Sequence, residues 1–314
     1  MENNSVVLVV AAPRCALVVQ VCSQAAAHAG GMVVCHGGDC SVNFTDTHFV
    51  GCTLVVLQGA KSTLTNCVFT RSTGGPSGVS VFASGPRTEV AMEGGSIRGG
   101  AEGVSIHKGA ALNATGLSVS GCFVAGIECR DSGSSLQLSD CTVSNFSQQC
   151  FEVVDVTGVL VQAGSKATIT GCTLDSVPYG VIVQSKAYAA ITRCQASGCC
   201  VTGLSVSSGV EVRIAECTLQ RCGVAGVHIF AEGTFATVTD CELAGSQEHG
   251  VLVSNFGRGD VQRCHMSKNG SGGAWVSFSG VLTMSGCSSV GNASSGYWAE
   301  SGVPSTHAHH ACKW

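Results

Sequence analysis

Residues 217–240 read CTLQRCGVAGVHIFAEGTFATVTD and residues 241–263 read CELAGSQEHGVLVSNFGRGDVQR, so this stretch holds two copies of one unit. Each copy opens with Cys, and each contains Gly followed by an apolar–x–apolar triplet, GVHI from Gly226 and GVLV from Gly250. A further alternating segment, such as ATV at 236–238, ends the unit. Alternation with a period of two predicts β-strands, and the Gly, Ser and Asn residues between the segments predict turns.

The same unit recurs through most of the chain with a period of about 23 residues, which indicates a repeat architecture. The glycines that begin the apolar–x–apolar triplet are Gly78, Gly103, Gly126, Gly180, Gly203, Gly226, Gly250, Gly273 and Gly296. In this interpretation CFEV at 150–153 fills the gap between Gly126 and Gly180. A second row of cysteines keeps the same period and comprises Cys52, Cys67, Cys141, Cys172, Cys194, Cys217, Cys241, Cys264 and Cys287.

Three short strands in about 23 residues predict one coil of a parallel β-helix, a stack in which each repeat contacts its neighbours. No stretch shows a sustained helical period. The fold class is therefore all-β, a single-stranded solenoid of about ten or more coils. The pattern resembles the right-handed parallel β-helix of the pectate-lyase-like superfold. In the style of its repeats it is similar to the F-box-type β-helix proteins, which carry the same short Cys-x-apolar and Gly-Val-x-Val coils.

The repeat also suggests how the chain is organised. We expect residues 41–299 to form the β-helix, residues 1–40 an irregular N-terminal cap or partial coils, and residues 300–314 a C-terminal tail. The segment 141–172 is longer than one repeat, which predicts a surface loop near 155–165.

Composition excludes several classes of protein. Hydrophobic residues are 45% of the 314, which excludes a disordered chain, and only 11% are charged. With 16 basic and 20 acidic residues the net charge is −4, which argues against a nucleic-acid partner. No apolar run reaches about 18 residues, so no membrane span is expected.

The 20 cysteines raise the question of disulfides. Cysteines at the same position of successive coils point in parallel, about one strand spacing apart, which is longer than the Cβ–Cβ distance of about 3.5–4.5 Å in a disulfide. We therefore predict a ladder of buried free thiols, with Cys199 and Cys222 as a second partial ladder. Free thiols and a start without basic residues favour a cytoplasmic location. An extracellular location is the alternative, because an apolar run precedes Ala27-His28-Ala29 and six Asn-x-Ser/Thr sequons occur.

The middle residue of each apolar–x–apolar triplet should point outward and form one row along the solenoid. In its middle we expect Glu128 and Glu152 on adjacent coils, with Asp131 and Asp155 three residues further on and Arg130 beside them. Paired carboxylates about 5 Å apart suit glycosidase chemistry or a calcium site. The alternative is structural, because Asp at the start of a turn caps backbone amides.

The C-terminal half of the row holds the candidate binding residues. Adjacent Trp side chains can stack on a sugar ring or anchor a protein partner; alternatively, Trp298 covers the end of the core. The residues are Ile182, His228, Leu252, Trp275 and Trp298. In the tail, His307, His309, His310 and Cys312 are weak candidates for a metal site.

Two functions remain open. The first is a non-catalytic scaffold with a lateral binding face for a protein or peptide and no cofactor. The F-box-type resemblance implies substrate recognition for a ubiquitin ligase; residues 1–40 lack a helical F-box pattern, so only the binding role is carried over. The alternative is a lyase, hydrolase or epimerase acting on a polysaccharide, or a carbohydrate-binding β-helix, with calcium as the ion that this alternative allows.

Overall fold

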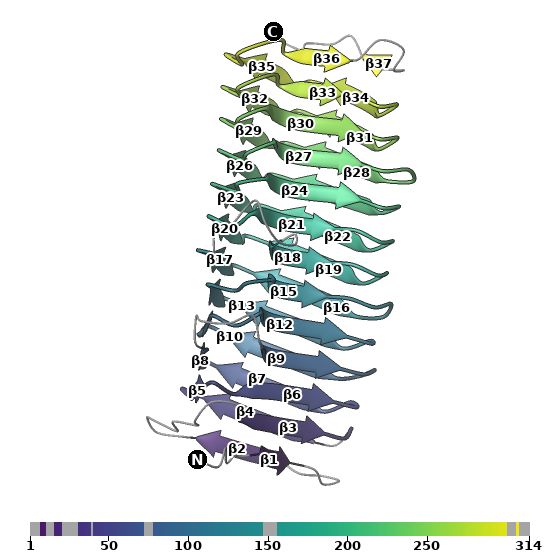
Figure 1. Ribbon diagram of the computed structural model, residues 1–314. Helices are drawn as coiled ribbons and strands as arrows, with labels where there is room; N and C mark the ends of the chain where they lie inside the picture. Colours follow the sequence, from purple (N-terminus) through teal and green to yellow (C-terminus); the bar gives the residue numbers. More distant parts are fainter. Residues whose placement is uncertain are drawn as a thin grey trace.

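A computed structural model describes residues 7–10, 16–20, 31–38, 40–71, 78–146, 156–299 and 306–307. These residues form strands and turns and no helix. The strands wind into a solenoid with the N-terminus at one end and the C-terminus at the other (Figure 1). The prediction of an all-β parallel solenoid is thus confirmed.

Three parallel sheets of 13, 13 and 11 strands run along the solenoid, and each coil from β3 to β35 contributes one strand to each. The first sheet contains β1 (Val7–Val10), β3 (Met32–His36), β6 (Thr53–Leu57), β9 (Val79–Ser84), β12 (Glu102–His107), β15 (Ala125–Cys129), β18 (Thr157–Val161), β21 (Tyr179–Val183), β24 (Thr202–Ser207), β27 (Ala225–Phe230), β30 (His249–Ser254), β33 (Ala274–Val276) and β36 (Tyr297–Ala299).

The second and third sheets repeat this order. The second contains β2 (Ala16–Gln20), β4 (Ser41–Thr45), β7 (Lys61–Thr65), β10 (Glu89–Glu93), β13 (Ala111–Thr115), β16 (Ser135–Ser139), β19 (Lys166–Thr170), β22 (Tyr188–Thr192), β25 (Glu211–Ala215), β28 (Phe235–Thr239), β31 (Arg258–Gln262), β34 (Val281–Ser285) and β37 (Thr306–His307). The third contains β5 (His48–Val50), β8 (Val68–Thr70), β11 (Ser96–Arg98), β14 (Ser118–Ser120), β17 (Thr142–Ser144), β20 (Thr173–Asp175), β23 (Gln195–Ser197), β26 (Thr218–Gln220), β29 (Glu242–Ala244), β32 (His265–Ser267) and β35 (Ser288–Val290).

One continuous core fills the solenoid with inward-facing Val, Ile, Leu, Ala and Cys side chains. The nine cysteines of the predicted row are all buried and free, and so are Cys199 and Cys222. In this row Cys217 donates its thiol hydrogen to the carbonyl of Ala215 at 3.2 Å, and its backbone N–H donates to Sγ of Cys241 at 3.4 Å. The thiol ladder is thus confirmed for these positions, whereas Cys200 is disulfide-bonded.

The glycine row is required because the backbones of successive coils approach closely there. A Cβ added to Gly203 would lie 2.8 Å from the carbonyl oxygen of Gly226, and one added to Gly226 would lie 2.9 Å from that of Gly250. Contacts under about 3 Å force the backbone to shift, so only glycine fits. The sequence motif therefore marks the position in the first sheet where successive coils lie too close for a side chain, and we call this position the glycine corner.

The coil between Gly126 and Gly180 corrects one sequence assignment. The strand that pairs with β15 is β18, in which Ile127 pairs with Val159. The missing repeat glycine is therefore Gly158, and CFEV at 150–153 does not supply this strand. The extra residues precede β18 instead of following it, so residues 156–165 are not the predicted surface loop.

The ends of the chain also contribute strands. Within the segment expected to cap the core, β1 pairs with β3 and β2 pairs with β4. Near the other end β37 pairs with β34. A helix with the length and apolarity to cross a bilayer does not occur among the described residues.

Candidate functional site

The outward row of the first sheet brings the predicted binding residues into one line. Neighbours along this row are Ser105, Glu128, Leu160, Ile182, Ser205, His228, Leu252, Trp275 and Trp298, each paired with the next across adjacent strands. Strand neighbours lie about 4.8 Å apart, so the row is roughly 38 Å long. We call the outward surface of this sheet, from β9 to β36, the outer face.

The expected pair of Glu128 and Glu152 on adjacent coils does not form in this row. The position beside Glu128 on the following coil is held by Leu160, because β18 supplies that strand. Glu152 itself and Asp155 lie outside the described residues. The prediction was wrong because the repeat position was assigned to Cys150, whereas the repeat glycine is Gly158, eight residues later.

Glu128 instead belongs to a buried polar cluster on β12 and β15. The Ser105 hydroxyl donates to its Oε2 at 3.1 Å, and the Gln162 amide donates to its Oε1 at 2.8 Å. The same hydroxyl lies 2.6 Å from Nε2 of His107, and Nε of Arg130 donates to Nδ1 of that ring at 3.0 Å. Nε of Arg130 also lies 3.0 Å from Nε2 of the same ring, so the guanidinium and the Ser105 hydroxyl both contact the His107 imidazole.

A second carboxyl group, that of Glu102, joins this cluster. Burial raises the pKa of Glu102, and a hydrogen bond with the Glu128 side chain raises it further, although its bond with Ser105 has the opposite effect. Burial and the nearby Arg130 guanidinium lower the pKa of His107. The lowered pKa leaves the His107 imidazole neutral at pH 7, which reduces the charge that this buried cluster must carry.

Asp131 and Arg130 take different places. Asp131 has a φ of 74° in the turn after β15, and its Oδ2 accepts a hydrogen bond from the backbone of Lys108 at 3.2 Å. This is the turn-capping role of the structural alternative. The Arg130 side chain is 43% exposed and its Nε lies 3.8 Å from Oε1 of Glu128, so the guanidinium closes the cluster on the solvent side.

A groove of about 300 Å³ hollows the middle of the outer face. It is lined by Tyr179, Ile182, Gln184, Val201, Thr202, Ser205, Ser207, Val224, His228 and Phe230. His228 stacks on Phe230 with ring centroids 4.4 Å apart, and its Nε2 lies 3.0 Å from the Ser254 hydroxyl. Burial lowers the pKa of His228 to about 4, so its imidazole is neutral at pH 7.

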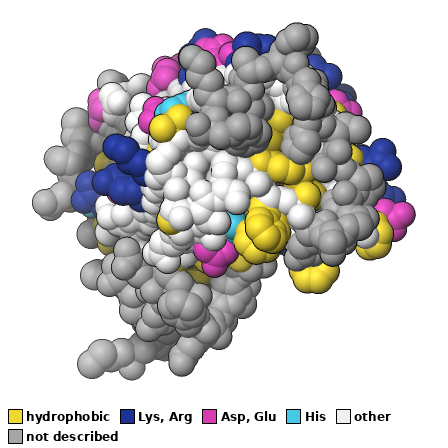
Figure 2. Space-filling view, turned by 90° about the horizontal axis from the view of Figure 1, so that it is seen from above, with side chains coloured by type: hydrophobic (Ala, Val, Ile, Leu, Met, Phe, Trp, Pro, Cys, Tyr) yellow, Lys and Arg dark blue, Asp and Glu magenta, His cyan; other side chains and the backbone are white. Residues whose placement is uncertain are grey.

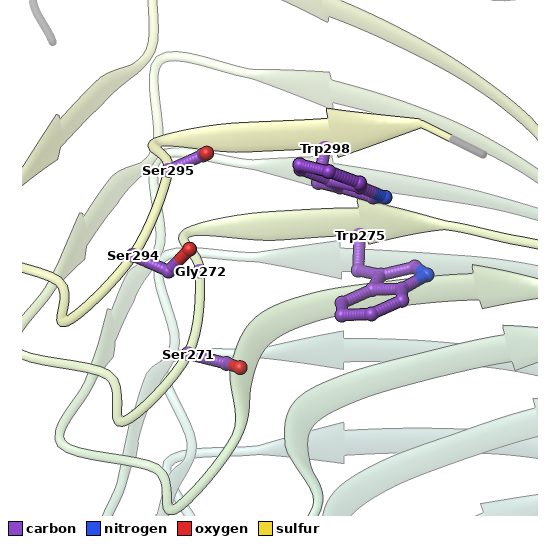
Figure 3. A pocket seen from close by; sticks show the side chains of 6 residues that line it. All are labelled: Ser271, Gly272, Trp275, Ser294, Ser295 and Trp298. Carbon is purple, nitrogen blue, oxygen red and sulfur yellow. The ribbon is translucent and has the colours of Figure 1, made fainter. Parts of the chain in front are cut away.

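A smaller pocket of about 210 Å³ lies near the C-terminal end of the same face. It is lined by Ser271, Gly272, Trp275, Ser294, Ser295 and Trp298. The two indoles come from β33 and β36, and the serines come from the turns before these strands (Figure 3). The indole centroids are 6.2 Å apart and inclined by 41°, and the Trp298 residue is 51% exposed. Two aromatic surfaces and nearby hydroxyls can hold a ligand that is apolar on one side and hydroxylated at its edge.

Sequence reasoning did not identify His107, Glu102, Gln162 and Gln184 as parts of this face. For three of them the sequence does hold a signal. The residue two positions after each first-row residue also points outward, which gives a second outward row that includes His107, Gln162 and Gln184. Glu102 precedes the glycine corner, where regular alternation fails, and only the structure shows that its side chain reaches Ser105 and Glu128.

No group of three or more His, Cys, Asp and Glu side chains among the described residues is arranged to hold a metal ion. His307 lies in β37, and the other three tail candidates, His309, His310 and Cys312, lie outside the described part of the chain.

Comparison with known proteins agrees with this architecture. The family model described as "Right handed beta helix region" matches residues 32–159 and 157–310. No curated protein sequence matches the chain.

Among solved structures, the periplasmic alginate epimerase AlgG superposes with a TM-score of 0.70 at 12% identity, covering 98% of this chain and 78% of that one. The catalytic domain of a GH87 alpha-1,3-glucanase in complex with nigerose gives 0.54 at 11% identity, covering 91% and 64%. The A-module of the Azotobacter vinelandii mannuronan C-5 epimerase AlgE6 gives 0.52 at 13% identity, covering 87% and 88%. At these identities the likeness shows the fold.

Proposed function

We propose that this chain, which belongs to the right handed beta helix family, binds a linear polysaccharide along its outer face. The observation that carries the proposal is the Trp275–Trp298 pair, which forms one side of a pocket in line with the central groove. Polymer chains need an extended site with repeated contacts. The row from Ser105 to Trp298 offers such a site along the solenoid axis.

The solved structures support a carbohydrate ligand over a protein ligand. The epimerases named above act on alginate or mannuronan, and the glucanase is in complex with nigerose. The outer face has the chemistry that such ligands require, since Ser and Gln side chains can bond sugar hydroxyls and aromatic rings can cover sugar faces. The alternative of a polysaccharide-directed β-helix is therefore preferred to the protein-binding scaffold.

We assign the carboxyl cluster a structural role in this function. The side chains of Glu102 and Glu128 are hydrogen-bonded to each other, whereas retaining glycosidases hold their carboxyl groups about 5–5.5 Å apart. Glu128 is 5% exposed and its two oxygens accept bonds from Ser105 and Gln162. The cluster thus holds the side chains of β12 and β15 in place. We therefore propose binding, and not catalysis, as the function.

The test is affinity electrophoresis of the full chain in gels that contain soluble polysaccharides, with Trp275→Ala/Trp298→Ala as the variant. We expect retardation of the wild type by at least one polymer and at least tenfold weaker binding by the variant, equivalent to about 1.4 kcal/mol. Phe256→Ala is the matched control, because Phe256 is 60% exposed in the turn before β31 and away from the pocket.

Two results would contradict the proposal. Retardation that the double Trp substitution leaves unchanged would place the polymer elsewhere on the molecule. If no polysaccharide bound the wild type, the first predicted function, a scaffold whose outer face binds a protein, would be preferred.

A further inference from the structure

The outer face is almost free of charge, and this property bears on the kind of polymer it takes. Its outward positions form three rows. The described members of the first row are Phe82, Ser105, Glu128, Leu160, Ile182, Ser205, His228, Leu252, Trp275 and Trp298. Those of the second row are Ser84, His107, Arg130, Gln162, Gln184, Ser207, Phe230, Ser254 and Ser277. Those of the third row, beside the glycine corner, are Val79, Glu102, Ala125, Thr157, Tyr179, Thr202, Ala225 and His249. Among them, Glu102, Glu128 and Arg130 are the only Asp, Glu, Lys or Arg residues.

These three charged residues are grouped on two coils and interact with one another. Arg130 lies 3.8 Å from Glu128, and Glu102 is hydrogen-bonded to Glu128. From β18 to β36 the described outward positions carry hydroxyl, amide, aliphatic and aromatic groups.

Arg71 donates to the carbonyl oxygen of Val79 in β9 at 2.7 Å, beside the first coil of this face, and other basic side chains lie elsewhere on the molecule. Lys61 begins β7 of the second sheet and pairs with Glu89 at 2.8 Å, and Arg263 pairs with Asp240 at a corner of the coil. Viewed from above the C-terminal end, Lys and Arg side chains gather at separate places on the perimeter (Figure 2). Among the described residues, no Lys or Arg side chain lines the central groove or the pocket of Trp275 and Trp298.

We infer that the ligand of the outer face is a neutral glycan, such as a glucan or a mannan, and not a polyuronate such as alginate. This inference rests on the proposed function. Every residue of a polyuronate carries a carboxylate, and removing a carboxylate from water without a cationic partner is costly. A neutral sugar presents hydroxyl groups, which the Ser and Gln side chains of this face can bond, and C–H faces, which the indoles can cover.

The pocket of Trp275 and Trp298 is the anchoring subsite in this inference. His249 packs edge-on against Trp275 with ring centroids 4.8 Å apart and is only 4% exposed, so the indole has a rigid support. Leu252 adjoins Trp275 along the row and extends the uncharged surface toward the central groove. Rigid aromatic side chains lose little entropy on binding and therefore suit a weakly interacting neutral ligand.

The experiment compares the full chain in gels that contain neutral polymers, namely soluble α-glucan, β-glucan and mannan, or acidic polymers, namely alginate and polygalacturonate. We expect at least one neutral polymer to bind at least tenfold more tightly than either acidic polymer. Raising NaCl from about 50 to about 500 mM should leave this binding unchanged within about twofold, because no ion pairs are screened.

A charge variant provides the second measurement. Gln184→Lys adds a cation to the central groove, and Gln220→Lys adds the same charge to β26 of the third sheet as a control. We expect Gln184→Lys alone to gain alginate binding that falls as salt rises. Alginate binding no stronger than that of the control would overturn the inference, because charge on this face would then not select the polymer.

The remaining outcomes separate the two proposals. Tighter binding of alginate or polygalacturonate by the wild type would overturn the neutral ligand and leave a polysaccharide function standing. Failure of neutral and acidic polymers alike would overturn the proposed function, and the neutral ligand with it.

Discussion

His228 shows how one side chain on the outer face couples this site to the stability of the fold. The ring is stacked on Phe230 and largely buried, and burial lowers its pKa to about 4 from an ordinary value of 6.5. Between these two values the unfolded chain binds a proton that the folded chain does not. Its contribution to stability is therefore complete above pH 6.5 and falls as the pH is lowered toward 4.

We predict that His228→Asn has a flatter pH dependence of unfolding than the wild type. The shift corresponds to at most about 3 kcal/mol of stability lost by the wild type between pH 7 and pH 4. Urea unfolding at a series of pH values measures this difference, with the exposed His265→Asn as control. Parallel curves for wild type and His228→Asn would show that the ring is solvated in the folded state.

Glu102 should change stability with pH in the opposite direction to His228. Burial and the neighbouring Glu128 carboxylate raise its pKa above the ordinary 4.5, so the folded state holds this proton more tightly than the unfolded chain. Its contribution to stability is present below pH 4.5 and is lost as the pH rises through the raised pKa. Glu102→Gln should therefore raise the urea midpoint at pH 7 relative to wild type, with the advantage gone near pH 4. A lower midpoint at pH 7 would mean that the charged carboxylate is favourable in the folded state.

At the scale of the element, each strand is defined by its contacts with the equivalent strands of the coils before and after it. The glycine corner shows this dependence. A Cβ on Gly158 would lie 2.6 Å from the carbonyl oxygen of Gly180 and 3.0 Å from a methyl group of Leu174. The clash involves the backbone of the next coil, which cannot move without disturbing the ladder of strands.

We predict that Gly158→Ala destabilises the protein by about 1–3 kcal/mol, the cost of overpacking a close-packed interior. Gly38→Ala is the matched control, because a Cβ at Gly38 meets nothing within 4 Å. Thermal unfolding of both variants gives the comparison. Equal melting temperatures would mean that the corner relaxes around a methyl group and that the glycine row has another cause.

The thiol ladder is a second element-scale feature with a measurable consequence. Burial raises the pKa of the ladder thiols of Cys52 and Cys67, and it raises to about 12 the pKa of Cys35, Cys122 and Cys129, which are buried outside the ladder. Thiolates are the reactive form, so these side chains should be inert in the native protein. All 15 described free cysteines are buried, so iodoacetamide followed by mass spectrometry of peptides should modify them only after denaturation. Rapid labelling of Cys217 or Cys241 in the native protein would contradict a closed ladder.

At the scale of the whole molecule, the solenoid is a line of coils in which stability depends on neighbours. β24 is paired on both sides, with β21 and β27, whereas among the described residues β35 ends the third sheet and pairs only with β32. In such arrays the terminal repeats open more readily than central ones. We predict that amide hydrogens of β21 to β25 exchange more slowly than those of β35 and β36, as measured by mass spectrometry. Equal exchange along the chain would indicate that the solenoid opens only as one unit.

The sequence by itself determined the repeat, the three strands per coil, the inward cysteines and the outward row that contains Trp275 and Trp298. These features follow from local alternation and a constant period, which recur in successive repeats. The tertiary structure decided which residues become neighbours where the period changes or alternation fails. It placed Leu160 beside Glu128, and it brought Glu102, before the glycine corner, onto Ser105. Where a coil is longer than the repeat, the sequence period does not say which residues pair with the strand before. Hydrogen bonding between the stacked coils decides that register, so it appears only in the tertiary structure.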